Sequence, residues 1–275
     1  MNSVMTEGYD KYLNNIASSK PLIQQITNYV TVNDCANITL AIGASPVMAD
    51  AIEEVADIVK ISSALVINIG TLNPTTLEAM FVAGKKANEI NIPVILDPVG
   101  AGASTYRNEK TMQLLKEVNF SVIRGNISEM KFIAGLSANT KGVDASDEDA
   151  TSDVGQIAPA LAKEHNCVVV ISGSRDIISD GKRTVAILNG HPAMANVTGT
   201  GCMSASLIAS FCGANPDHIF GSAITAALCM GVAGEIAYER VGNLGTCSLR
   251  DAIIDEISKM KSATLVERGC VNEIS

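Results

Sequence analysis

Several polar residues in this sequence follow directly after short apolar runs, and their types are those that bind phosphate and divalent cations. Asp97 follows VIL, Arg124 follows SVI with Glu129 five residues later, and Ser172 follows VVVI. In an open α/β sheet, ligands bind beyond the carboxyl ends of the strands. If the apolar runs are parallel strands, these four side chains therefore gather at one edge of the sheet.

A further motif, Gly199-Thr200-Gly201-Cys202, opens a long stretch of helical composition. Glycines let the backbone approach an anion closely, and the free N–H groups of a first helical turn then point at it. An ordinary helix start explains the motif equally well, since glycine-rich helix starts are common. The two standard phosphate-binding motifs, G-x-x-x-x-G-K-[ST] and G-x-G-x-x-G, are absent from the sequence.

Each of these residues also has a purely structural interpretation. Asp97 precedes Pro98, and Asp-Pro often only turns the chain. Asn126 and Glu129 have the spacing of a capping box, and Arg124 could form a structural ion pair. The functional interpretation is that Asp97 and Glu129 hold a hydrated Mg²⁺, which needs only one or two carboxylates together with substrate phosphates.

The elements that would position these residues alternate between strand-like and helical segments. The strand-like runs are Leu22–Ile26, Ala64–Ile69, Val94–Leu96, Ser121–Ile123 and Cys167–Ile171. They are short, apolar and rich in β-branched residues, as strands of a buried parallel sheet are. The pattern predicts an α/β fold with a mostly parallel central sheet flanked by helices, in one domain over residues 1–275.

The connecting segments carry helix and turn signals. Thr31–Ile42 has a helical period, Asp50 is expected to cap a helix that continues to about Val59, and Asn73-Pro74 opens another helix. The segment Ile177–Leu188 predicts an antiparallel hairpin at one sheet edge. After Gly199 we expect only helix to the end of the chain.

Composition limits the class of protein. The chain has 275 residues, 47% of them hydrophobic and 18% charged, and a net charge of −9. This acidic balance disfavours nucleic-acid binding, and the seven cysteines, an odd number with no C-x-x-C pair, disfavour a disulfide framework. No signal-peptide core is present at the N-terminus, and the uncharged stretches 197–216 and 219–234 are interpreted as buried helices. We therefore expect a cytoplasmic protein with no membrane partner.

Taken together, the motifs resemble a known superfamily. N-x-x-E at residues 126–129 followed by G-T-G at 199–201 resembles the ribokinase superfamily. Four longer segments narrow the resemblance to the hydroxyethylthiazole kinase family of thiamine salvage: ITNYVTVNDCAN (26–37), GASPVMAD (43–50), LDPVGAGAS (96–104) and NVTGTGC (196–202). Most superfamily members carry aspartate after G-T-G as a base, whereas the narrower family carries cysteine, as this sequence does at Cys202.

The resemblance implies a reaction and a set of roles. The activity would be ATP- and Mg²⁺-dependent phosphorylation of the hydroxyl of 4-methyl-5-(2-hydroxyethyl)thiazole. The implied site residues are Met48 and Gly199 for the thiazole, Arg124 and Ser172 for ATP, Thr200 and Gly201 for the anion hole, Asp97 and Glu129 for Mg²⁺, and Cys202 facing the substrate hydroxyl. A helix start can lower a thiol pKa, but nearby phosphates would oppose the thiolate. We therefore expect Cys202 to be a modest base at best, with the backbone anion hole carrying more of the catalysis.

The resemblance also implies a ribokinase-like fold and a homotrimer with sites between subunits, since the sequence shows no inserted lid. Three other functions stay open. The chain could phosphorylate another hydroxymethylated heterocycle of the pyrimidine or pyridoxal type, it could be a non-catalytic nucleotide sensor, or it could be a ribokinase-like hydro-lyase acting on damaged nicotinamide cofactor.

Overall fold

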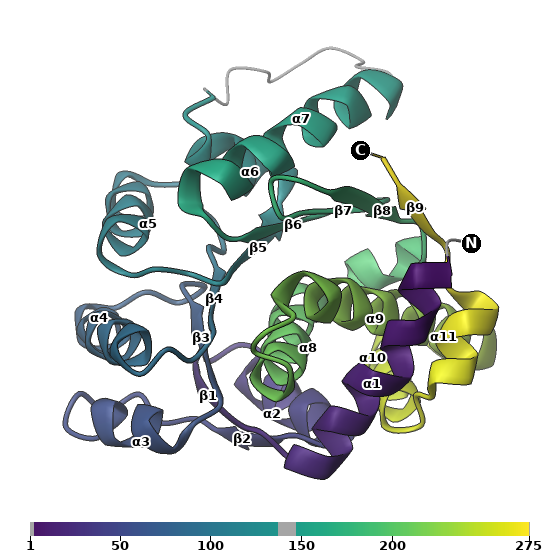
Figure 1. Cartoon of the computed structure of the whole chain (residues 1–275), viewed down its shortest axis with the longest axis horizontal. Helices are drawn as coiled ribbons and strands as arrows, with labels where there is room; N and C mark the ends of the chain where they lie inside the picture. Colours follow the sequence, from purple (N-terminus) through teal and green to yellow (C-terminus); the bar gives the residue numbers. More distant parts are fainter. Residues whose placement is uncertain (1–2, 137–146, 275) are drawn as a thin grey trace.

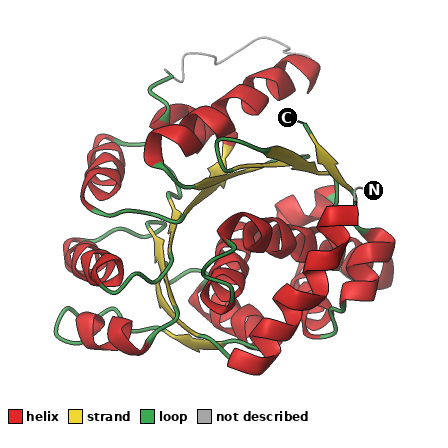
Figure 2. Ribbon diagram, in the orientation of Figure 1, coloured by secondary structure: helices red, strands yellow, loops and turns green. Residues whose placement is uncertain are grey.

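The computed structural model describes residues 3–136 and 147–274. Its centre is a nine-stranded sheet with the order β2-β1-β3-β4-β5-β6-β7-β8-β9, which curves around a group of helices (Figures 1 and 2). The strands are β1 Leu22–Ile26, β2 Ser45–Val47, β3 Ala64–Asn68, β4 Val94–Asp97, β5 Val122–Asn126, β6 Val168–Ser172, β7 Asp176–Ser179, β8 Thr184–Ile187 and β9 Val271–Glu273. The predicted α/β class is confirmed.

The strands from β2 to β6 pair in parallel, and the strands from β6 to β9 pair antiparallel. All residues of β3 and β4 are buried, because helices cover both faces of the sheet. The five apolar runs predicted as strands all form strands, and the segment predicted as a hairpin forms β7 and β8.

Two layers of helices enclose the sheet (Figures 1 and 2). The outer layer, on the convex face, contains α3 Val55–Ile61, α4 Pro74–Glu89, α5 Thr105–Glu117, α6 Ile127–Ile133 and α7 Asp147–His165. The layer inside the curve contains α1 Ser3–Ser19, α2 Val32–Ala41, α8 Thr200–Ala214, α9 Ile219–Val241, α10 Thr246–Ser258 and α11 Ser262–Arg268. Each layer packs its own buried apolar cluster against the sheet.

The helix starts show which local predictions were right. Asn73 caps α4 by accepting a hydrogen bond from the Thr76 N–H, with Pro74 at the first helical position, as predicted. Asp50 does not cap α3. Residues 51–54 first form a turn closed by hydrogen bonds to the Ala51 carbonyl, so α3 begins only at Val55.

The expectation that the chain is helical to its end was also wrong. Val271–Glu273 forms β9, which pairs with β8 at the register Ile187↔Val271. A strand of three mostly exposed residues has no apolar pattern of its own, and only its pairing with β8 makes it a strand.

The apolar helices are part of the core. Helix α9 is long and apolar enough to cross a membrane, but 78% of its most apolar window is buried inside the fold. Helix α8 is buried along nearly its whole length. The fold therefore uses both as central helices that pack against the concave face of the sheet.

Candidate active site

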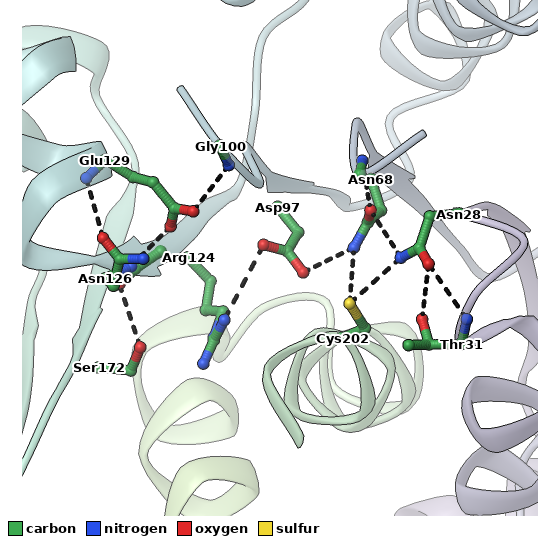
Figure 3. Close-up of polar contacts among 12 residues, drawn as sticks. Asn28, Thr31, Asn68, Asp97, Gly100, Arg124, Asn126, Glu129, Ser172 and Cys202 are labelled. Atoms are coloured by element: carbon green, nitrogen blue, oxygen red, sulfur yellow. Dashed lines mark hydrogen bonds and ion pairs between the residues drawn. The ribbon is translucent and has the colours of Figure 1, made fainter. Parts of the chain in front are cut away.

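The carboxyl ends of four neighbouring strands meet at one edge of the sheet, as the sequence predicted. Asn68 ends β3 and Asp97 ends β4, and the two are register partners. Asn126 ends β5 and Ser172 ends β6, and these are register partners as well. The N-terminus of α8 lies across this edge, so Cys202 faces the end of β3 and Asp97 (Figure 3).

Two buried amides contact Cys202. Asn28 Nδ2 and Asn68 Nδ2 each donate to the Cys202 Sγ at 3.3 Å. Asn68 Nδ2 also donates to Asp97 Oδ2 at 2.7 Å, and Asn28 Nδ2 donates to Asn68 Oδ1 at 3.1 Å. These contacts join the ends of β1, β3 and β4 to the first turn of α8 in one polar network (Figure 3).

Asp97 is fully buried, and its Oδ1 has no hydrogen-bond partner. Arg124 Nη1 lies 3.9 Å from this oxygen, too far for a hydrogen bond but close enough for an ion pair. Burial raises the pKa of Asp97 to about 6, while the Arg124 charge lowers it and the Glu129 charge raises it further. The carboxylate therefore has one oxygen available for a ligand.

Glu129 has a structural role that the sequence had offered as an alternative. Its side chain accepts from the Asn126 N–H at 2.8 Å, and Asn126 Oδ1 accepts from the Glu129 N–H at 3.0 Å, which completes the capping box of α6. Its second oxygen accepts from the Gly100 N–H at 2.9 Å. Each oxygen of Glu129 thus already binds a backbone donor, and a cation would use only the remaining lone pairs.

Arg107 holds the loops that follow β3 and β4. Its guanidinium donates to the backbone carbonyls of Ile69, Gly70 and Val99. Because these carbonyls flank Asn68 and Asp97 in sequence, Arg107 fixes the two loops next to the polar network. The sequence analysis did not identify this residue, since nothing in a surface-like helix sequence shows that its arginine reaches back to a strand end.

The first turn of α8 depends on both glycines of the G-T-G motif. Gly199 has a φ of 91°, and a Cβ there would lie 2.6 Å from Thr31 Cγ2. A Cβ on Gly201 would lie 2.5 Å from Arg124 Nη1. Glycine is therefore needed at 199 for its left-handed backbone and at 201 because the Arg124 guanidinium crosses the helix start.

Helix α8 begins with unbonded N–H groups at this point. The first intrahelical hydrogen bond runs from the Met203 N–H to the Gly199 carbonyl at 2.8 Å. The N–H groups of Thr200, Gly201 and Cys202 precede it, so they are free to bind an anion.

A cavity of about 490 Å³ opens beside this helix start. Its polar lining includes Arg124, Ser172 and Thr200, and its other lining residues include His191 and Met194. The His191 ring stacks on Tyr238 with a centroid distance of 3.5 Å, and Met194 packs against Gly234, where any side chain would collide with it. The cavity thus has a cationic polar end and an apolar end, as a nucleotide requires.

Asp176 also lines this cavity, and the sequence analysis missed it. It accepts from the Gly173 N–H at 3.1 Å. Burial raises the pKa of Asp176 to about 6, against the lowering effects of that hydrogen bond and of Arg124. A larger hollow of about 550 Å³ lies at the opposite, amino ends of the strands. Its charged lining residues are Asp180 and Asp217, so it is unsuited to a phosphate.

The thiol of Cys202 is less acidic than its place at a helix start suggested. Burial raises its pKa, and the neighbouring Asp97 charge raises it further, whereas hydrogen bonds with Thr31, Asn68 and Asn28 lower it. Because the raising effects prevail, the thiol is protonated at neutral pH. A helix start alone therefore does not make Cys202 a thiolate, because burial and the Asp97 charge raise its pKa.

The structure brings most of the predicted site residues together. Asp97, Arg124, Ser172, Glu129 and the 199–202 motif lie around one edge of the sheet (Figure 3). Met48 directly follows the edge strand β2, which pairs with β1, and is partly buried. Asn28 and Asn68 were missed. The signal that could have found them is a polar residue at the end of an apolar strand, as in ALVIN.

Comparisons with known proteins place the chain in a family. The hydroxyethylthiazole kinase family model matches residues 13–263. The chain belongs to the hydroxyethylthiazole kinase family. It is 56% identical to a hydroxyethylthiazole kinase of Ruminiclostridium cellulolyticum, over 99% of this chain and 100% of the relative. It is 57% identical to that of Clostridium beijerinckii, over 95% and 96% of the two chains.

Solved structures agree with this membership. The hydroxyethylthiazole kinase structure from Pyrococcus horikoshii superposes with a TM-score of 0.89 at 33% identity, covering 98% of this chain and 100% of that one. A ribokinase-like protein of Enterococcus faecalis superposes with a TM-score of 0.64 at 14% identity, over 94% and 95% of the chains. The second likeness shows the fold alone, which is ribokinase-like as predicted.

Proposed function

We propose that this chain transfers the γ-phosphoryl group of ATP to the hydroxyl of 4-methyl-5-(2-hydroxyethyl)thiazole, in the synthesis of thiamine diphosphate. The observation that carries this proposal is the placement of Cys202. It lies in the first turn of α8, between the polar network at the ends of β3 and β4 and the cavity that Arg124 lines. Family membership supplies the substrate.

The nucleotide would occupy the 490 Å³ cavity, with its base at the apolar end and its phosphates at the start of α8. The free N–H groups of Thr200, Gly201 and Cys202 and the Arg124 guanidinium would bind the transferring group. Phosphoryl transfer asks little covalent chemistry of the protein, so positioning and electrostatics dominate. One well-placed donor of this kind contributes about 3 kcal/mol.

The alcohol would approach from the side of Cys202. Since the thiol is protonated, it is a weak base, and its main role would be to hold the hydroxyl in line with the phosphorus. The Asp97 carboxylate accepts from the same Asn68 amide as the cysteine sulfur, and it would be available to take a proton that the alcohol releases. This arrangement places more of the catalysis in the anion-binding helix start than in the cysteine.

Mg²⁺ fits the residues present. Asp97 has a buried oxygen with no partner, and carboxylate oxygens are the ligands that Mg²⁺ prefers. Glu129 would bind the ion through the lone pairs that its two backbone donors leave free. Among the described residues, no group of three or more potential ligands holds a metal by itself, so the ion would bind together with ATP. When bound, it would neutralise charge on the phosphates.

The thiazole pocket would be completed by a neighbouring subunit in a homotrimer. Met48 and Gly199 are the residues proposed to contact the thiazole. Tyr29 and Val30 follow β1 beside Asn28 of the polar network, and they are 77% and 60% exposed. Exposed apolar side chains beside a site mark an interface. The assembly would function in the cytoplasm.

The activity is tested by ³¹P detection of a phosphate ester after incubation with the thiazole alcohol, ATP and Mg²⁺. A panel that includes pyridoxal and a hydroxymethylpyrimidine identifies the preferred acceptor. Faster turnover of another alcohol would replace the proposed substrate, and ATP binding without any ester would leave the chain a nucleotide sensor.

The assembly is tested by sedimentation. Replacing Tyr29 with aspartate should dissociate the trimer and lower activity. The matched control is Ile61→Asp, which changes a side chain that is 67% exposed on α3, in the outer helix layer. A fully active monomer at micromolar concentration would contradict the proposal.

A further inference from the structure

The orientations of the two amides beside Cys202 are fixed by backbone donors. The Gly70 N–H donates to Asn68 Oδ1 at 2.9 Å. The N–H groups of Val30 and Thr31 each donate to Asn28 Oδ1 at 3.1 Å. A backbone N–H can only donate, so the oxygen of each amide must face the backbone and the NH₂ group must face the site.

All four amide hydrogens then have one acceptor each. Those of Asn68 point to Asp97 Oδ2 and Cys202 Sγ, and those of Asn28 point to Asn68 Oδ1 and Cys202 Sγ. Cys202 Sγ is therefore an acceptor from two directions. The hydrogen of the thiol therefore cannot point toward either amide.

Asn68 is the centre of this arrangement. Its side chain is 1% exposed and contacts both groups proposed to act on the substrate hydroxyl. The Gly70 N–H holds the plane of this amide, and Arg107 in turn donates to the Gly70 carbonyl. A rigid, fully satisfied amide fixes its acceptors within a few tenths of an ångström.

We propose that Asn68 is a positioning residue of the phosphoryl transfer: its two amide hydrogens hold the Cys202 sulfur and the Asp97 carboxylate in one fixed relation, so that the thiol faces the acceptor alcohol. Asn28, which follows β1, also donates to the sulfur and helps to hold it in place. This inference rests on the proposed role of Cys202. It predicts that the effect of Asn68 on turnover depends on the cysteine being present.

A double-mutant cycle tests this dependence. Asn68→Ala should lower kcat about 30-fold with Cys202 present, and much less, about 3-fold, in a Cys202→Ala background, where only the contact with Asp97 remains to be lost. The magnitudes follow those of misplaced catalytic groups. The KM for ATP should stay unchanged, because Asn68 does not line the nucleotide cavity.

A matched control is Asn215→Ala. Asn215 is 3% exposed and caps the opposite end of α8, where its Nδ2 donates to the Phe211 carbonyl at 2.9 Å. It should lower the melting temperature without changing kcat. If Asn68→Ala does not fold, the nearly isosteric Asn68→Leu enters the same cycle, because it removes both donors without adding a charge beside Asp97.

The outcomes test the role of Asn68 and the role of Cys202 separately. Equal fold losses in both backgrounds would show that Asn68 acts independently of Cys202, and would overturn this inference alone. Wild-type turnover of Cys202→Ala would overturn the role of the cysteine and this inference with it. A reduced loss in the Cys202→Ala background, with an unchanged KM for ATP, supports the inference.

Discussion

Replacing Gly201 with alanine should lower activity without lowering stability. The added Cβ would lie 2.5 Å from Arg124 Nη1 and 3.2 Å from Arg124 Cζ, closer than such atoms approach one another. The guanidinium is the far end of a flexible side chain, so it can move away at little cost to folding. Once it moves, it no longer crosses the start of α8, where the phosphates are proposed to bind.

The magnitude follows from the contact that is lost. Hydrogen bonds that involve a charged group contribute about 1.5–3 kcal/mol. Since about 1.4 kcal/mol is a factor of ten, kcat/KM for ATP should fall by roughly 10- to 100-fold. Stability should move the other way, because alanine favours a helix over glycine by about 0.5–1 kcal/mol.

The assay is a coupled ADP-release measurement at varied ATP, alongside thermal unfolding. Gly155→Ala in α7 is the matched control, since no atom lies within 4 Å of its added Cβ. It should gain the same helix stability and keep wild-type kinetics. If Gly201→Ala also kept the wild-type kcat/KM for ATP, Arg124 would have no role against the helix start.

Three further predictions concern single residues of the site. Gly199→Ala should lower the free energy of unfolding by about 1–3 kcal/mol, because its φ is 91° and its Cβ would meet buried Thr31; an unchanged melting temperature would contradict this. Cys202→Ala should lose about 10- to 1000-fold in kcat, and Cys202→Asp should keep substantial activity in the same assay. The anion-binding helix start remains in both variants. A Cys202→Ala variant more active than Cys202→Asp would refute this prediction. Asp176→Asn should stabilise the fold by about 1–2 kcal/mol at pH 8 and not at pH 4. The pKa of Asp176 in the fold, raised to about 6, lies above its value in the unfolded chain. The stability that the protonated form contributes is therefore complete below the unfolded pKa and is lost as the pH rises through about 6. Denaturant unfolding at the two pH values measures this difference, and equal effects at both would show that folding does not raise the pKa of Asp176.

The sequence predicted the parts of the fold whose cause is local. Ala64–Ile69 was expected as a strand, and β3 covers Ala64–Asn68, because a strand buried on both faces is apolar along nearly its whole length. The cap at Asn73 was predictable for the same reason, since its side chain bonds the helix that follows it. The edge strand Val271–Glu273 was not, because its partner β8 lies far away in the sequence.

The same distinction between local and long-range causes holds for the residues of the candidate site. Asp97 and Arg124 could be found because each follows a recognisable strand. The contact of Asn28 and Asn68 with Cys202 could not be predicted, since the sulfur is 174 and 134 residues away from them along the chain. The causes of the raised pKa of Cys202 could not be predicted, because burial and the nearby charge of Asp97 arise only from tertiary packing.

The anchoring of the nucleotide cavity has a consequence for synthesis on the ribosome. Its wall at Asn189 is tied to residues that emerge much later: Asn189 Oδ1 accepts from the Cys270 N–H, 81 residues away, and its Nδ2 donates to the Arg268 carbonyl at 2.9 Å. Gly190 is likewise bound to Glu235 through its N–H at 2.9 Å. A nascent chain that has already formed β1 to β8 therefore still lacks the partners that fix this wall, and a growing polypeptide cannot trap ATP in a finished cavity before translation has passed residue 270.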